Sequence, residues 1–184
     1  MERSVWRLGA VLLFTVFLLH CHRDSSKELV LLDFESDSEL DRLDWKCHAL
    51  YSLSHEHSTH GLKSLKMELY PSDYPGVAPL LREHDWSRYK AFCFDIYNPQ
   101  KTAVTITVRL DDDKKYPNYG DRCNKKVVLQ SGVNRVVIPL SSFITSGSRR
   151  QLNLKSIWRF FIFLPHPHER IVLFLDYIRL SRNY

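Results

Sequence analysis

Acidic residues stand beside apolar segments at both ends of the chain, and this placement suggests metal chemistry. Asp176 interrupts the apolar run from Ile171 to Leu180, and the apolar residues 29–32 are followed by Asp33 and Glu35. A buried carboxylate is costly unless a partner compensates it. We therefore expect the two terminal segments to lie side by side as strands, with their acids sharing a cation.

Other clusters of reactive side chains have weaker chemical signatures. Asp111, Asp112 and Asp113 end an expected strand, where consecutive side chains diverge and are usually solvated. A glycosidase needs two carboxyls that face each other across a cleft, so a hydrolase using Asp95 and Asp111 is a third alternative. The three histidines of residues 55–60 are more typical of a solvated loop than of a zinc or copper site. Gly-x-Ser-x-Gly and glycine-rich phosphate motifs are absent from the sequence, and we expect no enzyme activity.

Alternating segments would place polar and aromatic side chains together on one face of a sheet. Residues 102–111 alternate strictly, so their even-numbered apolar members share one face, and Arg109 and Asp111 share the other. In residues 156–164, the phase that turns Arg159 outward also turns Phe161 and Phe163 outward. The loop 111–122 adds two tyrosines on a rim that we expect to be flexible. This outward group comprises Tyr97, Arg109, Asp111, Tyr116, Tyr119, Arg159 and Phe161.

These side chains need a framework of short strands, which the rest of the sequence supplies. Periods of two and turn pairs such as Asn98-Pro99 predict roughly eight or nine strands. One of these strands is expected around Trp45 to Leu53, and short helices are expected at 38–43 and 141–144. Many short strands separated by turns are typical of an antiparallel β-sandwich or jelly roll. The predicted fold class is therefore all-β.

The chain divides into an export segment, a linker and one domain. Arg3 and Arg7 precede the apolar run 8–19, and a polar stretch follows. This layout is typical of an export signal, and the run is shorter than a membrane-spanning helix requires. We assign residues 1–21 to the signal, 22–28 to a polar linker and 29–182 to a β-sandwich domain.

The end of the export segment bears on how the protein is attached to the cell. Leu18-Leu19-His20-Cys21 resembles a bacterial lipobox, in which the cysteine is lipidated and anchors the protein to the membrane. His20 stands where a small residue is expected, so ordinary cleavage and an uncleaved anchor also stay open. In each case we expect a protein of the cell envelope or a secreted protein.

The distribution of charge argues against a nucleic-acid-binding face, and the spacing of the cysteines argues against a structural zinc site. The formal net charge of +5 is scattered, and the basic residues do not interleave with aromatic ones as a nucleic-acid face requires. Cys47, Cys93 and Cys123 lack the spacing of a structural zinc site. In an exported chain, one disulfide and one free thiol are plausible, and the sequence leaves the pairing open.

Six short motifs follow one another along the domain in a recognisable order. They are Leu32-Asp33-Phe34-Glu35, the stretch His60 to Met67, Asp85-Trp86-Ser87-Arg88-Tyr89, the stretch Phe92 to Pro99, the stretch Gly132 to Leu140, and the stretch Leu175 to Leu180. In this order the chain resembles the non-catalytic carbohydrate-binding modules with a galactose-binding-like jelly-roll fold. The resemblance covers nearly all of residues 29–182.

This resemblance implies a structural calcium ion. In such modules calcium commonly joins the first and last strands, held by carboxylates and by backbone carbonyls of an early loop. Carried onto this chain, the ligands would be Asp33, Glu35 and Asp176, with carbonyls around His60 and Lys63. The ion would stabilise the fold rather than act in catalysis. The alternative is an ordinary salt bridge from Asp176 to Arg179 or Lys63.

The resemblance also implies that the open sheet face binds a polysaccharide or glycan. Sugars stack their C–H faces on aromatic rings, and their hydroxyls need polar partners. Core packing is an equal alternative for Tyr97, Phe161 and Phe163, and a cross-strand ion pair is the alternative for Arg109 and Asp111. Because related domains occur in proteins that bind no sugar, the alternative function is a structural or protein-interaction domain of the envelope.

Overall fold

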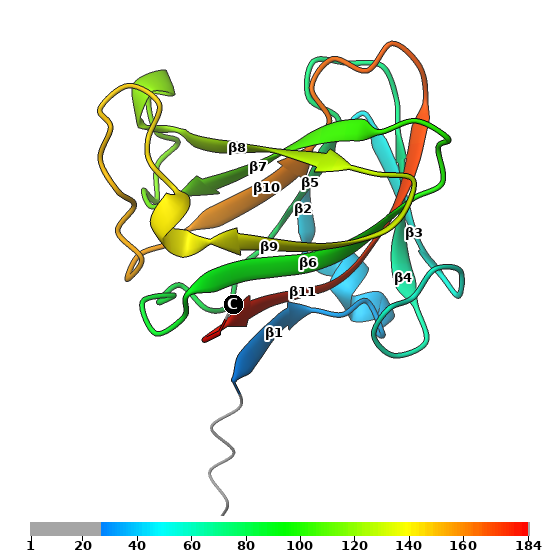
Figure 1. Cartoon of the computed structure of the whole chain (residues 1–184), viewed down its shortest axis with the longest axis horizontal. Coiled ribbons are helices and arrows are strands. Elements are labelled where there is room, and N and C mark those ends of the chain that lie inside the picture. Colours follow the sequence, from blue (N-terminus) through cyan, green and yellow to red (C-terminus); the bar gives the residue numbers. More distant parts are fainter. Residues whose placement is uncertain (1–26, 184) are drawn as a thin grey trace, which may run out of the picture.

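The computed structural model describes residues 27–183, in which eleven strands form two antiparallel sheets (Figure 1). The six-stranded sheet contains β1 (Glu28–Leu32), β3 (Ala49–Ser54), β4 (Ser64–Leu69), β6 (Ala91–Asn98), β9 (Gly132–Pro139) and β11 (Ile171–Ser181). The five-stranded sheet contains β2 (Leu43–Cys47), β5 (Gly76–Pro79), β7 (Val104–Asp111), β8 (Cys123–Leu129) and β10 (Arg159–Phe163). The strand orders are β3-β4-β11-β6-β9, with β1 beside β11, and β2-β5-β10-β7-β8. The predicted all-β sandwich of the jelly-roll class is confirmed.

The hydrophobic core lies between the sheets and follows the expected alternation. Phe92, Phe94 and Ile96 of β6 are buried, as are the even-numbered residues of β7. Trp86, before β6, is also buried and stacks on Phe92 with ring centroids 5.5 Å apart. Burying a large apolar side chain contributes roughly 1.5–3 kcal/mol. This layer therefore holds in place the strands whose opposite faces carry the polar residues.

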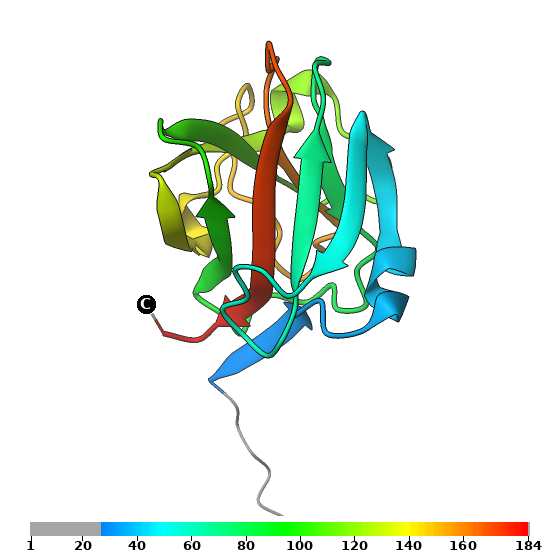
Figure 2. The ribbon, with the colours of Figure 1, turned by 90° about the vertical axis from the view of Figure 1, so that its right-hand side faces the viewer.

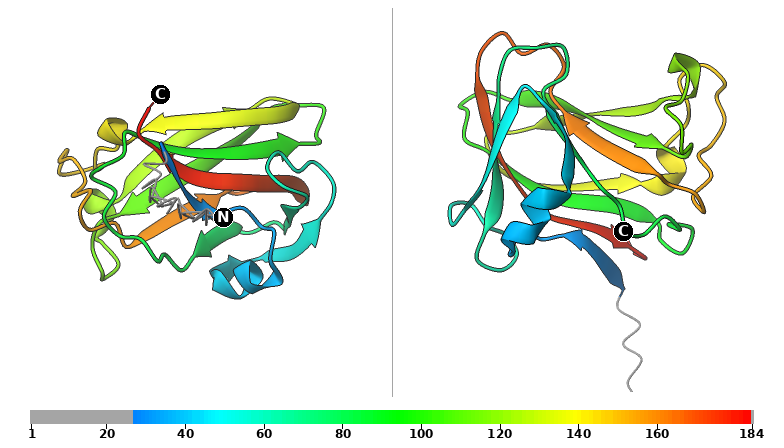
Figure 3. Two further views of the ribbon diagram at one scale, coloured as in Figure 1. Left: turned by 90° about the horizontal axis from the view of Figure 1, so that it is seen from below. Right: turned by 180° about the vertical axis from the view of Figure 1, so that it is seen from behind.

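The two terminal strands lie side by side, as their sequences predict. Strand β1 pairs antiparallel with β11, and Figure 3 shows the two from below and from behind. Strand β11 also lies beside β4, next to β3 (Figure 2). Its ladder with β6 shifts register after Asp176, where Tyr177 has a positive φ of 47°. Such an irregularity re-aims side chains, which explains why Asp176 and Tyr177 depart from a regular alternation.

Several predicted elements have different bounds in the structure. The single strand expected around Trp45 to Leu53 is two strands, β2 and β3, in different sheets. His48, with a φ of 42°, turns the chain between them. The four residues of β5 are too few to show a period, so this strand lies outside the predicted set. The expected short helices are the 3-10 helices η1 (Asp37–Arg42) and η3 (Leu140–Ser142), and a third, η2 (Tyr119–Asp121), lies in the loop after β7.

The cysteines of the described residues are free thiols, and the plausible disulfide does not form. Cys47 and Cys123 belong to strands of the five-stranded sheet, whereas Cys93 belongs to β6 of the other sheet. Cys123 faces the core, and its thiol donates to the carbonyl of Ile144 at 3.1 Å. Because these side chains occupy different places in the sandwich, a disulfide would need the backbone to move. Burial raises the pKa of Cys123 to about 11.

The predicted export segment, including Cys21, lies outside the described residues. Within residues 27–183, no helix has both the length and the apolar character needed to cross a membrane.

Candidate functional site

A cleft of about 520 Å³ opens on the outer face of the five-stranded sheet. Strands β7, β8 and β10 form its floor, and the loops before β5 and after β7 contribute to its rim. Its lining residues are Tyr74, Thr107, Arg109, Tyr116, Tyr119, Arg122, Asn124, Lys126, Phe161, Phe163 and Pro165. The cleft therefore combines aromatic rings with basic and amide groups.

Six of the seven residues in the predicted outward group gather at this cleft. Arg109, Tyr116, Tyr119 and Phe161 line it, and Asp111 and Arg159 lie beside them. In the ladder between β7 and β10, Arg109 lies opposite Phe161, and Asp111 lies opposite Arg159. Directly opposed residues of an antiparallel pair have their side chains on the same face. The register of two neighbouring strands thus assembles the floor of the cleft.

The carboxylate of Asp111 holds two arginine side chains on the floor. Arg109 donates from Nε and Nη2 to its two oxygens at 2.8 and 2.7 Å, and Nε of Arg159 lies 3.5 Å from Oδ2. Asp111 is fully buried, and the two arginine side chains are 12% and 20% exposed. Ion pairs this deeply buried are weakly screened and geometrically strict. They fix both guanidinium groups, so they are not the low-value cross-strand pair considered above.

Aromatic side chains surround this charged floor. Tyr116, Tyr119 and Tyr74 are 67%, 77% and 48% exposed. The guanidinium of Arg159 lies 4.3 Å from the ring centre of Tyr116, and Tyr74 meets Phe163 edge-on at 5.6 Å. Phe161, for which core packing is the alternative, is only 5% exposed, whereas these three tyrosines are accessible. Their exposed ring faces are suited to planar contact with a ligand that has apolar C–H surfaces.

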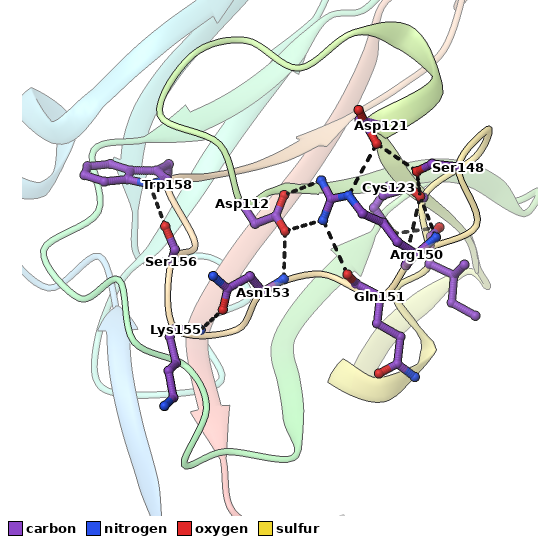
Figure 4. A network of polar contacts seen from close by, with 12 residues as sticks. Asp112, Asp121, Cys123, Ser148, Arg150, Gln151, Asn153, Lys155, Ser156 and Trp158 are labelled. Atoms are coloured by element: carbon purple, nitrogen blue, oxygen red, sulfur yellow. Dashed lines mark hydrogen bonds and ion pairs between the residues drawn. The ribbon is translucent and has the colours of Figure 1, made fainter.

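A polar network holds the rim loop after β7, which the sequence predicts to be flexible (Figure 4). Arg150 donates to both carboxylate oxygens of Asp112 at 2.6 and 3.0 Å, and to Asp121 at 3.3 Å. The N–H of Asn153 donates to Asp112 at 2.7 Å. Burial alone would raise the pKa of Asp112, but the hydrogen bonds from Arg150 and Asn153 outweigh it and hold that pKa below its usual value. The network thereby positions η2 and its first residue, Tyr119.

Seven lining residues are absent from the predicted group: Tyr74, Thr107, Arg122, Asn124, Lys126, Phe163 and Pro165. The alternating exposure of β8 places Asn124 and Lys126 on the outer face, so the period of two in residues 123–129 is a signal that could have identified them. Tyr74 and Arg122 come from loops, which have no such period. Tertiary structure alone brings them to the cleft.

Tyr97, the seventh member of the predicted group, lies on the other sheet. It belongs to β6, and its ring stacks on His57 with centroids 3.5 Å apart and planes 8° apart. In the same loop, His60 stacks on Tyr177 at 4.0 Å. His57 and His60 therefore stack on aromatic rings of the six-stranded sheet, while His55 and His57 stay exposed, as expected for a solvated loop. Tyr97 does not contribute to the cleft.

Two acids of the terminal segments, Asp176 and Glu35, accept hydrogen bonds from backbone N–H groups of the loop 59–63. Oδ2 of Asp176 accepts from the N–H groups of residues 59 and 60 at 2.6 and 2.9 Å. Oε1 of Glu35 accepts from those of residues 62 and 63 at 2.8 and 2.7 Å. Burial raises the pKa of Asp176 against the opposing effect of these hydrogen bonds, and the N–H of Lys63 lowers the pKa of Glu35. We call this arrangement the terminal clasp.

The terminal clasp collects the residues nominated for calcium but does not present them as calcium ligands. His60 Nε2 lies 3.9 Å from Asp33 Oδ2, so Asp33 also lies beside the loop 59–63. Calcium requires six to eight oxygen ligands, whereas N–H groups face the carboxylates of Glu35 and Asp176. Residues 27–183 also contain no group of three or more His, Cys, Asp or Glu side chains arranged for a metal. The donor set thus does not fit calcium as it stands, and calcium binding stays a prediction.

The structure also bears on two alternatives from the sequence: a salt bridge between Asp176 and Arg179, and a hydrolase site using Asp95 and Asp111. Asp176 does not form the salt bridge considered with Arg179, because Arg179 pairs with Asp95 at 3.2 Å and with Glu28 at 3.4 Å. Asp95 and Asp111 belong to different sheets, and arginine side chains neutralise each of them. They do not face each other across one cleft as the hydrolase alternative requires.

Comparison with known proteins identifies the fold. No protein-family model matches the chain, and no curated protein matches its sequence. A family 11 carbohydrate-binding module from Clostridium thermocellum, solved in complex with a β-1,3-1,4-mixed-linked tetrasaccharide, matches with a TM-score of 0.62 and 20% identity, over 84% of this chain and 95% of the module. The chain has the fold of a carbohydrate-binding module.

Enzymes that contain a similar domain match over a smaller part of their length. An exo-β-agarase matches with a TM-score of 0.69 and 17% identity, over 85% of this chain and 25% of the enzyme. An arabinose-bound α-L-arabinofuranosidase matches with a TM-score of 0.57 and 12% identity, over 83% of this chain and 26% of the enzyme. The chain therefore spans about a quarter of these enzymes, and the likeness concerns the fold alone.

Proposed function

We propose that the chain is an exported, non-catalytic protein that binds a polysaccharide or glycan in the cleft of the five-stranded sheet. The observation that carries this proposal is the set of exposed rings of Tyr74, Tyr116 and Tyr119 around a floor of fixed arginine side chains. The rings offer flat apolar faces to sugar C–H groups, and the amide of Asn124 and the guanidinium of Arg109 offer partners to hydroxyls. A concave site with a few oriented polar groups is the usual form of a ligand site.

The comparisons support a binding module over an enzyme. The module that this chain covers over 95% of its length is a carbohydrate-binding module in complex with an oligosaccharide, whereas the agarase is matched over 25% of its length. The one acid pair considered for a glycosidase, Asp95 and Asp111, is separated onto different sheets. Binding without catalysis is therefore the simplest function for the cleft.

A glycan array with the purified full-length chain tests the proposal, and Tyr119→Ala supplies the decisive variant. Stacking on one ring is worth about 0.5–1.5 kcal/mol, so we expect binding to weaken about 2- to 10-fold. Leu50→Ala is the matched control, because Leu50 is also exposed but belongs to β3 of the other sheet. Absence of binding to every glycan would contradict the proposal and favour a structural or protein-interaction domain.

The proposed location of the protein is the cell envelope, with Cys21 lipidated or the N-terminal segment uncleaved, or the exterior of the cell. Incorporation of a labelled fatty acid into the wild type and its loss in Cys21→Ser would support the lipid anchor. Recovery of the chain in the medium, without label, would support secretion instead. Retention of the unlabelled chain inside the cell would contradict export.

A further inference from the structure

The charges that line the cleft have one sign. Arg109, Arg122 and Lys126 line it, and none of the described lining residues is acidic. The nearest buried carboxylate, Asp111, is shared between Arg109 and Arg159. One negative charge thus stands against two positive ones on the floor, and Arg122 and Lys126 add to the excess. A cleft with charges of one sign and apolar walls concentrates ligands of the opposite charge.

Arg122 is a cation that has kept an unfilled hydrogen-bonding position. Its guanidinium lies 5.5 Å from the ring centre of Tyr119, and its Nε is buried without a hydrogen-bond partner. The neighbouring carboxylate of Asp121 is engaged elsewhere, because it accepts hydrogen bonds from Arg150 at 3.3 Å and from Ser148 at 2.8 Å. Asp112 and Asp121 therefore form their ion pairs with Arg150, and Arg122 lines the cleft.

Lys126 extends the positive charge along the floor. It is exposed on β8 and lines the cleft next to Asn124 and opposite Thr107 of β7. Within residues 27–183 its ammonium group has no salt bridge. Lys125, the preceding residue, is half-buried and points to the opposite face, because side chains alternate along a strand.

We propose that the cleft selects acidic polysaccharides, whose sulfate or carboxylate groups bind between Arg122 and Lys126 while the sugar rings stack on the rim tyrosines. This inference rests on the proposed function. A guanidinium and an anionic oxygen form short, charge-assisted hydrogen bonds. The terminal N–H groups of the Arg122 guanidinium, rather than its buried Nε, can donate to a sulfate or carboxylate in the cleft.

Affinity electrophoresis of the full-length chain in gels with paired polysaccharides tests this selectivity. The pairs are κ-carrageenan against agarose, which compares a sulfated with an uncharged galactan, and polygalacturonate against its methyl ester. We expect the charged member of at least one pair to bind about tenfold more tightly. This preference should shrink as the ionic strength rises from ~0.05 M to ~0.5 M, because salt screens exposed charges. Retardation by κ-carrageenan alone would identify sulfate, and retardation by polygalacturonate alone would identify carboxylate.

Two lysine variants separate the cleft from general surface charge. Lys126→Gln and Lys125→Gln remove the same charge from adjacent positions that point to opposite faces. We expect Lys126→Gln to weaken binding to the charged polysaccharide about 3-fold, with Lys125→Gln close to the wild type. Arg122→Gln should cause a larger loss of binding to the charged polysaccharide, about tenfold.

The outcomes that would overturn the inference are distinct from failure of the proposed function. Equal binding to charged and uncharged members would remove the selectivity and leave carbohydrate binding in place. Equal losses in Lys126→Gln and Lys125→Gln would show a non-specific charge effect and would also overturn it. Absence of binding to all four polysaccharides would instead contradict the proposed function, and this inference with it.

Discussion

The two outer faces of the sandwich carry similar aromatic side chains but leave them in opposite states. On the six-stranded sheet, the protein's own histidines stack on Tyr97 and Tyr177. On the five-stranded sheet, Tyr116 and Tyr119 stay exposed beside a cleft. The residue type is the same on both faces, so type alone does not indicate a ligand site. Coverage by a loop of the same chain makes the difference.

The two faces also differ in how their charged side chains are balanced by groups of opposite charge. On the six-stranded sheet, Arg179 is balanced by Asp95 and Glu28. On the five-stranded sheet, Asp111 is shared by two arginine side chains, and the lining of the cleft adds further cations without acids. Arg179 is thus paired within the chain, whereas the lining of the cleft retains cations that a ligand can pair with.

The largest effect is expected from removing the charge that organises the cleft floor. Asp111→Asn would leave two mostly buried guanidinium groups without their carboxylate, and breaking a buried ion pair in this way costs about 3–5 kcal/mol. We expect a loss of this size in the free energy of unfolding, measured by urea denaturation. Asp113→Asn is the control, because Asp113 is exposed and two residues away, and it should change stability by less than about 0.5 kcal/mol. A loss below about 1 kcal/mol for Asp111→Asn would show that the floor does not depend on this carboxylate.

A crossed pair of variants tests whether the two aromatic faces have different roles. His57→Ala removes a stacked ring from Tyr97 and should reduce stability by about 0.5–1.5 kcal/mol, with polysaccharide binding unchanged. Tyr119→Ala should leave the urea midpoint nearly unchanged, because the side chain is 77% exposed, and should weaken binding. Affinity electrophoresis and urea denaturation of both variants provide the comparison. The distinction between the faces fails if His57→Ala reduces binding as much as Tyr119→Ala does.

The sequence predicts the β-sandwich and most of the cleft floor, because both depend on a period of two. The alternation of β7 places Arg109 and Asp111 on one face, and the phase of β10 adds Phe161 to it. The same reasoning fails for Tyr97, because alternation gives the face within a sheet but not which sheet becomes the open one. Tyr74 and Arg122 reach the cleft from loops, where tertiary contacts alone decide position.

A smaller effect is expected in the pH dependence, where Asp112 at the cleft rim and Asp176 in the terminal clasp should behave oppositely. The pKa of Asp112 is lowered, so its contribution to stability is complete above its ordinary pKa and is lost as the pH falls through the folded value. The pKa of Asp176 is raised, so its contribution is present at low pH and is lost as the pH rises through the folded value. The stability cost of Asp112→Asn should therefore be greater at neutral than at acidic pH, and that of Asp176→Asn greater at acidic pH. Urea denaturation across this range measures both slopes, and slopes of the same sign would contradict the assignment.

The smallest effect is expected from removing calcium, which asks what holds the loop that covers the six-stranded face. The family resemblance predicts that EGTA lowers the melting temperature, whereas a clasp made by backbone N–H groups predicts no change. We expect the second result, because the N–H groups of residues 59–63 already occupy the carboxylates of Asp176 and Glu35. The melting temperature with EGTA and with excess calcium should then agree within about 1 °C, which for a domain of this size corresponds to less than ~0.5 kcal/mol. A fall of several degrees with EGTA, reversed by calcium, would show that an ion stabilises the fold. In that case the loop 59–63 would have to turn oxygen atoms toward the acids, and the coverage of Tyr97 and Tyr177 would depend on the ion.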